Sequence, residues 1–138
     1  MAVEQTLILA KPDAMRRSLA GEIVARFERR GFRLRAARLL TVDRALAEEH
    51  YAEHEAKPFF GELVEFITSG PTLAFVLEGE GVIGTARTTI GATNPADAVP
   101  GSLRGDFAAA MPDNLVHGSD SPESAQREIA LWFPDGLA

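Results

Sequence analysis

The sequence predicts a single mixed α/β domain over residues 1–138, on three observations. A chain of 138 residues that is 46% hydrophobic and 25% charged is ordinary for one globular domain with a buried core. Short apolar runs typical of buried strands alternate with stretches whose apolar residues recur at helical spacing. No repeat, linker or low-complexity segment interrupts this alternation. Taken alone, alternating strands and helices favour a parallel, doubly wound sheet.

The first predicted strand is the apolar run Thr6–Ala10. It ends at Lys11, because Pro12 has no N–H to donate to a neighbouring strand. The next helix is predicted between Ser18, as its N-cap, and Gly31, which closes it in the left-handed conformation. Its apolar residues follow the i, i+3, i+4, i+7 pattern: Ala20, Ile23, Val24 and Phe27.

The middle of the chain returns to a strand at Phe32–Val42 and then predicts two helices. Asp43 caps the first of them, which we expect to continue to Glu55. The second begins at Pro58 and is ended by Ser69-Gly70-Pro71. Its apolar positions are Phe59, Leu63, Phe66 and Ile67.

The last part of the chain contains two further strands and two further helices. Strand Thr72–Leu77 precedes a helix at Val82–Ile90. Residues 91–113 are rich in glycine and proline, and a loop this long in a compact domain is usually functional or disordered. A short strand, Leu115–His117, then leads to a helix opened by Ser121-Pro122-Glu123. We expect this helix to bury Ala125, Ile129 and Trp132.

The composition excludes several classes of function. A formal net charge of −6 disfavours general attraction to nucleic acid or to anionic membranes, so an anionic ligand needs a local cationic pocket. The lack of cysteine excludes a disulfide framework and a thiolate metal site. The chain has neither a membrane-spanning apolar run nor the pattern of a signal peptide, and we therefore expect a cytoplasmic protein.

Six arginines crowd one interval, the only place where a nucleic-acid surface could lie. Helical and strand periodicity place them opposite apolar residues, as expected of solvated faces. We interpret all six in this way: Arg26, Arg29, Arg30, Arg33, Arg35 and Arg38.

The segment Asn114–Asp120 gives the clearest chemical signal. Its β-branched and leucine run delivers His117 onto the turn Gly118-Ser119-Asp120, at the mouth of a strand. Neutral imidazole is a nucleophile, and its ordinary pKa of about 6.5 leaves the neutral form abundant at pH 7. A phosphoryl group is the natural electrophile. A histidine that merely ends a strand is the alternative.

Cationic side chains elsewhere in the chain favour the phosphoryl interpretation. Lys11 stands at a strand end, Arg87 lies in or after a helix, and Arg104 lies in the long loop. Together they could neutralise the charge that spreads over a phosphoryl group during transfer. Pro58-Phe59-Phe60 offers an apolar platform for a base. Neutral hydrogen-bonding groups are available from Thr93, Asn94 and Asn114.

Two other motifs favour different chemistry. Gly79-Glu80-Gly81-Val82-Ile83-Gly84 follows a strand and enters a helix, as a dinucleotide-binding turn does, but the expected second strand with its acidic end is missing. His50-Tyr51-Ala52-Glu53-His54 fits the H-x-x-E-H pattern of zinc peptidases, although a third ligand would have to come from another helix. Turn glycines and a solvated helix face are the simpler interpretations.

Over nearly its whole length the chain resembles the nucleoside diphosphate kinase family. The matching blocks occur in the family's order: Lys11-Pro12-Asp13, Gly21-Glu22-Ile23, His50-Tyr51, Lys57-Pro58-Phe59-Phe60, Thr68-Ser69-Gly70-Pro71, residues 91–97, residues 100–107, residues 114–121 and Glu123-Ser124-Ala125. So many ordered blocks make the resemblance highly specific.

The resemblance implies a role for each matched residue. His117 is the histidine that becomes phosphorylated, and Glu128 orients its other ring nitrogen. The residues that hold phosphates and sugar are Lys11, Tyr51, Arg87, Thr93, Arg104 and Asn114. The base slot is lined by Phe59, Leu63 and Met111. Asp120 lies near the shell of a magnesium ion that is carried largely by the nucleotide phosphates.

The resemblance also implies the fold, the reaction and the partners. It replaces the parallel sheet by an α/β sandwich with a ferredoxin-like βαββαβ core, a four-stranded antiparallel sheet and extra helices. The implied reaction is ping-pong transfer from a nucleoside triphosphate, such as ATP or GTP, to a diphosphate, which balances nucleotide pools. The chain is expected to form a homo-oligomer, with tetramer and hexamer both open. A non-catalytic nucleotide-binding or interaction subunit is the alternative function.

Overall fold

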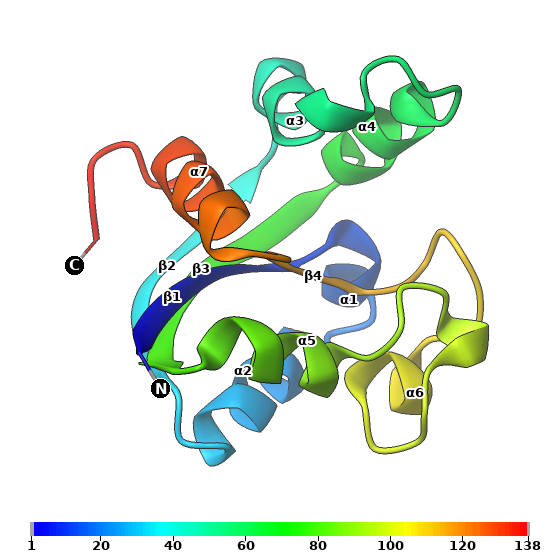
Figure 1. Cartoon of the computed structure of the whole chain (residues 1–138). Helices are drawn as coiled ribbons and strands as arrows, with labels where there is room; N and C mark the ends of the chain where they lie inside the picture. The colour runs from blue at the N-terminus through cyan, green and yellow to red at the C-terminus, as the bar shows by residue number, and fades with distance from the viewer. Residues whose placement is uncertain (1, 138) are drawn as a thin grey trace.

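A four-stranded antiparallel sheet forms the centre of the computed structural model, which describes residues 2–137 (Figure 1). The sheet has the order β2-β3-β1-β4. Its strands are β1 (Val3–Ala10), β2 (Arg33–Thr41), β3 (Pro71–Glu80) and β4 (Val116–Gly118). This arrangement confirms the ferredoxin-like fold. Met1 and Ala138, the ends of the predicted domain range, lie outside the described residues.

The parallel sheet expected from alternation alone is wrong, and the strand order explains why. Within residues 2–137, β3 pairs antiparallel with both β1 and β2, and β1 pairs antiparallel with β4. Strands β1 and β2 therefore run in the same direction, as do β3 and β4, but each such pair is separated by a strand of the other pair. Periodicity reports which segments are strands and carries no information on this interleaving.

Helices cover both faces of the sheet (Figure 1). One face is covered by α2 (Ala20–Arg29) and α5 (Val82–Ile90), and the other by α3 (Arg44–His50), α4 (Phe60–Thr68) and α7 (Pro122–Trp132). Two short helices, α1 (Pro12–Arg16) and α6 (Leu103–Phe107), and two 3-10 turns, Ala52–His54 and Pro95–Asp97, complete the fold. No helix within residues 2–137 has the length and apolar character that crossing a bilayer requires.

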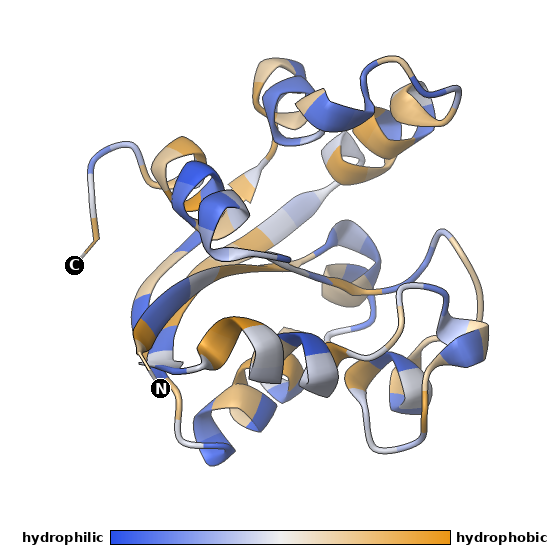
Figure 2. Cartoon of the chain, viewed as in Figure 1, coloured by the Kyte–Doolittle hydropathy of each residue, from blue (hydrophilic) through white to orange (hydrophobic). Residues whose placement is uncertain are grey.

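The central strand β1 supplies both halves of the core, because its side chains alternate between the two faces. Ile8 and Ala10 pack with Phe27 of α2 and residues of α5. Leu7 and Leu9 pack on the opposite face with residues of α3, α4 and α7, including Trp132. Figure 2 shows apolar residues along the central strands and on helices of both layers. A site built at the end of β1 therefore stands on a rigid base.

Several predicted helix ends are confirmed by their capping contacts. The side chain of Asp43 accepts a hydrogen bond from the Leu46 N–H at 2.8 Å, which fixes the start of α3. Ser121 accepts from the Ser124 N–H at 3.1 Å and starts α7. Helix α5 has the predicted bounds, and Gly31 has the predicted positive φ, +101°.

Other local predictions are wrong. Leu19, not Ser18, occupies the N-cap of α2, and Ser18 itself has a φ of +57°. The helix expected to continue to Glu55 stops at His50 and becomes a 3-10 turn. Pro12 ends β1 as predicted, but it also begins the unpredicted α1, since proline suits the first turn of a helix.

The long loop over residues 91–113 is not irregular throughout, because it contains α6 and a 3-10 turn. Ser102 caps α6 by accepting from the Gly105 N–H at 3.0 Å. Gly105 approaches the preceding chain so closely that an added Cβ would lie 1.9 Å from the Val99 oxygen. This tight fold fixes Arg104, the neighbour of Gly105, in the interior.

The sheet topology argues against the alternative that Gly79–Gly84 is a dinucleotide-binding turn. The Gly79–Gly84 motif follows β3, which is antiparallel to both of its neighbours, whereas a dinucleotide-binding turn requires a parallel βαβ unit.

Candidate active site

The centre of the predicted site lies where β1 ends and β4 begins, beneath α3 and α7. His117 is directly opposite Leu9 in the pairing of β4 with β1. Opposite residues share a sheet face, so the imidazole lies on the face covered by α3 and α7. His117 retains 24% exposure of its side chain, whereas Glu128 beside it retains 6%.

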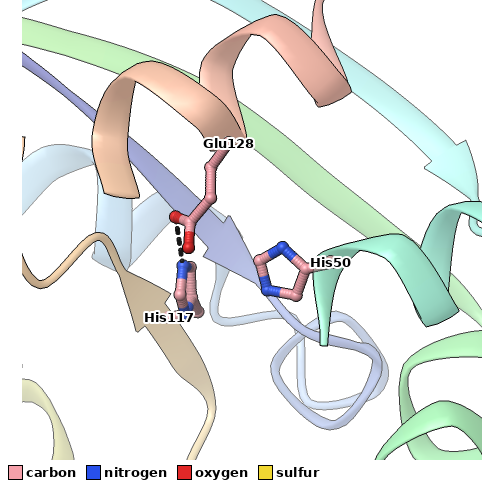
Figure 3. A group of neighbouring side chains, drawn as sticks. All are labelled: His50, His117 and Glu128. Carbon is pink, nitrogen blue, oxygen red and sulfur yellow. Dashed lines mark hydrogen bonds and ion pairs between the residues drawn. The ribbon is translucent and has the colours of Figure 1, made fainter. Parts of the chain in front are cut away.

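His117 is held by a buried carboxylate (Figure 3). Its Nε2 lies 2.9 Å from Oε1 of Glu128, and the Ser119 hydroxyl donates to the same oxygen at 2.7 Å. Ser119 in turn accepts from the backbone N–H of Leu7 in β1 at 3.2 Å. The contact with Glu128 places the ring proton on Nε2, which leaves Nδ1 with a free lone pair.

Glu128 is ionised at neutral pH despite its burial. Burial by itself raises the pKa of a carboxyl group, but the hydrogen bond from His117, the nearby imidazole groups of His117 and His50, and the hydrogen bond from Ser119 outweigh burial and lower the pKa of Glu128 to about 2. An ionised acceptor keeps the His117 tautomer fixed.

A second histidine, His50, packs against the ring of His117. His50, at the end of α3, accepts a hydrogen bond at Nδ1 from the indole N–H of Trp132 at 3.1 Å. Its ring centroid lies 4.8 Å from that of His117 with the planes at 78°, and Figure 3 shows its edge turned to the His117 ring. Arg127 donates to the carbonyl groups of Glu49 and His50, each at 3.1 Å, which ties the end of α3 to α7.

The zinc alternative fails on the geometry of these histidines. Among the described residues, the group with metal-ligand spacing is His50, His117 and Glu128, whose ligand atoms lie within 4.8 Å of one another, and it does not include His54. Trp132 can only donate, so His50 carries its proton on Nε2, the nitrogen that would have to bind the metal. If the proton moved to Nδ1 to free Nε2 for a metal, the N–H groups of His50 and Trp132 would face each other and their hydrogen bond would be lost.

Lys11 and Asn114 form the second part of the site. The Lys11 ammonium donates to the Asn114 side-chain oxygen, and the Asn114 amide donates to the Thr93 carbonyl at 3.0 Å. The same amide lies 3.5 Å from the sulfur of Met111. Burial lowers the pKa of Lys11 to about 8, with Asp13 opposing and Arg104 reinforcing the shift. Four predicted residues are thus brought together.

The two predicted arginines differ in their surroundings. Arg104 is 6% exposed and donates to the carbonyl groups of Asn114 at 3.0 Å, Gly91 at 3.0 Å and Val116 at 2.5 Å. Arg87 is exposed and donates to the carbonyl of Gly118 at 3.1 Å. Arg104 therefore fastens the chain around His117, while Arg87 keeps most of its donors free for a ligand.

Tyr51, Phe59 and Leu63 lie along α3 and α4. Tyr51 follows α3 and packs against His50 with ring centroids 4.8 Å apart. Burial raises the pKa of Tyr51 to about 12, so its hydroxyl stays protonated. Phe59 is 42% exposed at the N-cap of α4, one turn before the half-buried Leu63. An exposed aromatic ring beside a leucine offers a flat apolar surface.

Asp120 makes no described contact with another predicted site residue. It is exposed and lines a groove of about 1010 Å³ together with Arg26 of α2 and Thr88 of α5. Within residues 2–137 neither this groove nor a second one of about 720 Å³ is lined by His117 or Lys11. The role of Asp120 stays a prediction.

Sequence reasoning missed three residues that support His117: Ser119, His50 and Trp132. Ser119 stood in the turn motif, and Trp132 was predicted only as a core residue. Their contacts with the site join segments 9 to 82 positions apart in the chain, which local patterns do not report.

Comparisons with known proteins all find the same family. The family model described as nucleoside diphosphate kinase matches residues 4–137. A nucleoside diphosphate kinase of Rubrobacter xylanophilus is 61% identical over 131 residues, covering 95% of this chain and 98% of the relative. The one from Brevibacillus brevis is 60% identical over 131 residues, covering 95% of this chain and 89% of the relative.

Solved structures are also similar. The crystal structure of a nucleoside diphosphate kinase family protein from Babesia bovis has a TM-score of 0.94 at 43% identity, covering 98% of this chain and 92% of that one. A halophilic nucleoside diphosphate kinase from Halobacterium salinarum, solved in complex with CDP, has a TM-score of 0.95 at 46% identity, covering 99% and 92%.

The buried, neutral His50 predicts a specific pH dependence of stability. Burial, followed by the nearby charge of His117, lowers the pKa of His50 to about 3, whereas it is near 6.5 in an unfolded chain. The unfolded state therefore binds the extra proton between these values, and stability is lost as the pH falls from 6.5 towards 3. At pH 5 the loss from this group is about 2 kcal/mol.

Urea denaturation at pH 7 and pH 5 measures this loss. His50→Gln keeps an oxygen that can accept from Trp132 and cannot titrate, so its unfolding free energy is expected to fall less between the two pH values. His54→Gln serves as the matched control and should follow the wild type. An equal fall in H50Q and the wild type would contradict the expectation.

Proposed function

The chain belongs to the nucleoside diphosphate kinase family and is thus a phosphotransferase, and on this premise we propose that His117 carries the phosphoryl group between two nucleotides. A nucleoside triphosphate transfers its terminal phosphoryl group to His117, and the diphosphate leaves. A second diphosphate then takes the group from the histidine. Both half reactions use one pocket, so the kinetics are ping-pong, and the reaction balances triphosphate pools.

The contact between Glu128 and His117 carries this proposal. It occupies Nε2 and leaves Nδ1 as the nucleophile. When Nδ1 bonds to phosphorus the ring becomes more positive, and the ionised Glu128 stabilises that charge through the proton on Nε2. Glu128 keeps the proton on the ring throughout, which suits a group that must accept and release phosphate repeatedly.

The cationic residues act on the transferring group. Arg87 has free donors near Gly118, and Lys11 supplies a buried ammonium beside Asn114. Charge-assisted bonds from these groups and from the remaining donors of Arg104 would stabilise the equatorial oxygens of the phosphoryl group. Thr93 and the Tyr51 hydroxyl are proposed to hold sugar and phosphate oxygens.

Phe59 is the proposed platform for the base, with Leu63 and Met111 completing the slot. Apolar contact with a ring face does not discriminate among bases, since every base offers such a face. The chain is therefore expected to accept diverse nucleotides. The related Halobacterium salinarum enzyme was solved in complex with one nucleotide, CDP.

A divalent cation is the cofactor of such a reaction, and we propose that it is Mg²⁺. The residues fit an ion held mainly by phosphate oxygens, because Glu128 is already engaged by His117 and Ser119, and Asp120 is exposed. Mg²⁺ commonly binds proteins through few carboxylates and retained waters, so Asp120 would contact the ion through water. The ion supplies charge neutralisation of the nucleotide phosphates.

The free edge of β2 supports a homo-oligomer of this chain. A register shift between Leu34 and Ala36 puts three apolar residues of β2 on one face of the sheet: Leu34, Ala37 and Leu39. In β3 they pair with Leu77, Phe75 and Leu73, respectively. Leu34 is 39% exposed and Leu39 is 62% exposed. An exposed apolar stripe on an edge strand is a natural surface for a second copy. The tetramer and the hexamer both remain candidates for this assembly. The cytoplasmic location of the chain also stays a prediction.

Incubation with ATP and Mg²⁺ tests the covalent step. Intact-mass analysis is expected to show an acid-labile phosphoryl adduct in the wild type and none in His117→Ala, because that variant lacks the nucleophile. His54→Ala is the control and should retain the adduct. A wild type without adduct would favour the alternative of a non-catalytic nucleotide-binding subunit.

The two arginines are expected to separate catalysis from folding. Arg87→Met should lose about 2 to 4 kcal/mol of transition-state stabilisation, measured as kcat/KM, with unfolding free energy changed by less than about 0.5 kcal/mol. Arg104→Met should lose a similar amount and also destabilise the fold by at least about 2 kcal/mol, since three carbonyl groups lose their donor. Arg29→Met, on the exposed face of α2, is the control. If R87M kept half the wild-type efficiency, its assigned role would be wrong.

Light scattering tests the β2 surface. Leu39→Lys is expected to lower the molecular mass of the assembly, because a charge on the exposed Leu39 position of the apolar stripe opposes its burial. Val3→Lys, at an equally exposed apolar residue of β1, should leave the mass unchanged. Assembly of L39K at the wild-type mass would rule out this surface, and a monomeric wild type would rule out the oligomer.

A further inference from the structure

Leu115 has a backbone conformation that leucine rarely adopts. Its φ is +71°, in the left-handed region, and its side chain is 1% exposed within the core. This conformation is unfavourable for any residue that has a Cβ atom. A leucine keeps it only where contacts with its neighbours impose it. Leu115 therefore needs a structural cause.

Contacts with Lys11 and Asp13, in the segment that follows β1, supply that cause. The Leu115 N–H donates to Oδ2 of Asp13 at 2.9 Å, and its carbonyl accepts from the backbone N–H of Lys11 at 2.9 Å. Asp13 is 4% exposed. Its other oxygen, Oδ1, accepts no hydrogen bond from residues 2–137, so the contact with Leu115 is the one described bond of this buried carboxylate. Both peptide groups of Leu115 are thus held by one short segment.

The left-handed turn at Leu115 decides where its neighbours point. Asn114 and His117 are three positions apart, and in a straight strand residues at odd separation point to opposite faces. Here Asn114 meets the ammonium of Lys11, which lies 5.4 Å from the ring centroid of Phe66 in α4. That is the sheet face of His117. Without the turn, one of the two side chains would leave the site.

We propose that Asp13 is a positioning residue for phosphoryl transfer: its carboxylate holds Leu115 in the left-handed conformation and so keeps Asn114 and His117 on one face. The inference rests on the proposed function only for its effect on catalysis. Asp13 need not touch the nucleotide. The competing explanation is that Asp13 serves as a counter-charge for Lys11 and Arg104.

Two substitutions distinguish these explanations. Asp13→Asn keeps an oxygen that can accept from Leu115 and removes the charge, whereas Asp13→Ala removes both. We expect D13N to retain kcat/KM within about threefold of the wild type and D13A to lose at least about tenfold. Asp135→Asn, at an exposed aspartate near the end of the chain, is the matched control and should behave as the wild type. Equal losses in D13N and D13A would favour the counter-charge and overturn the proposal.

A double-mutant cycle tests the backbone directly. Glycine adopts positive φ without cost, so the effect of Asp13→Ala on kcat/KM should shrink to less than about threefold in the L115G background. The cavity left by the leucine is present in both members of that comparison and cancels. A loss as large as in the wild-type background would contradict the proposal.

Hydrogen exchange of the Leu115 amide gives a readout independent of activity. In the free protein, followed by NMR, this amide should exchange at least about tenfold faster in D13A than in the wild type, and at a near-wild-type rate in D13N. If D13A fails to fold, D13N decides, and fast exchange there overturns the proposal. A wild type without transfer activity would refute the proposed function, whereas the exchange rates would still judge the contact with Asp13.

Discussion

The site depends on one buried carboxylate that cannot be left without donors. Glu128 lies on the buried side of α7 next to the sheet, and an unpaired charge there would be strongly destabilising. His117 and Ser119 supply its hydrogen bonds, and Ser119 is itself bound to the backbone of β1. Satisfying Glu128 therefore fixes the helix, the central strand and the imidazole relative to one another. The proposed nucleophile, His117, is oriented by the same contacts that close the core.

Helix α7 also connects the site to the end of α3. Trp132 binds the ring of His50, and Arg127 binds the end of α3 through two carbonyl groups. At its C-terminal end, the Trp132 carbonyl accepts from Arg38 of β2 at 3.1 Å. The helix that carries Glu128 thus also holds the segment that carries Tyr51. A chain of polar contacts runs from the sheet edge to the proposed nucleotide site.

Sequence patterns predicted what is local and failed on what is not. The bounds of α5 and the cap at Asp43 follow from spacing and side-chain chemistry within a few residues. The antiparallel sheet had to come from the family resemblance, because no local signal reports that β3 lies between β1 and β2. His117, Lys11 and Arg104 were recognisable as candidates, but the supporting contacts of Ser119 and His50 exist only once distant segments meet. The left-handed Leu115 was equally invisible, since leucine gives no sign of it.

The three carbonyl contacts of Arg104 have a thermodynamic consequence for ligand affinity. A long flexible side chain normally gives up rotational freedom when it grips a phosphate, at about 0.5 to 1.5 kcal/mol per residue. In this protein the guanidinium is already immobilised by Asn114, Gly91 and Val116 before any nucleotide arrives. The ordering cost is met during folding, so under the proposed function the nucleotide phosphate would meet a preorganised donor, and more of the contact energy would contribute to binding.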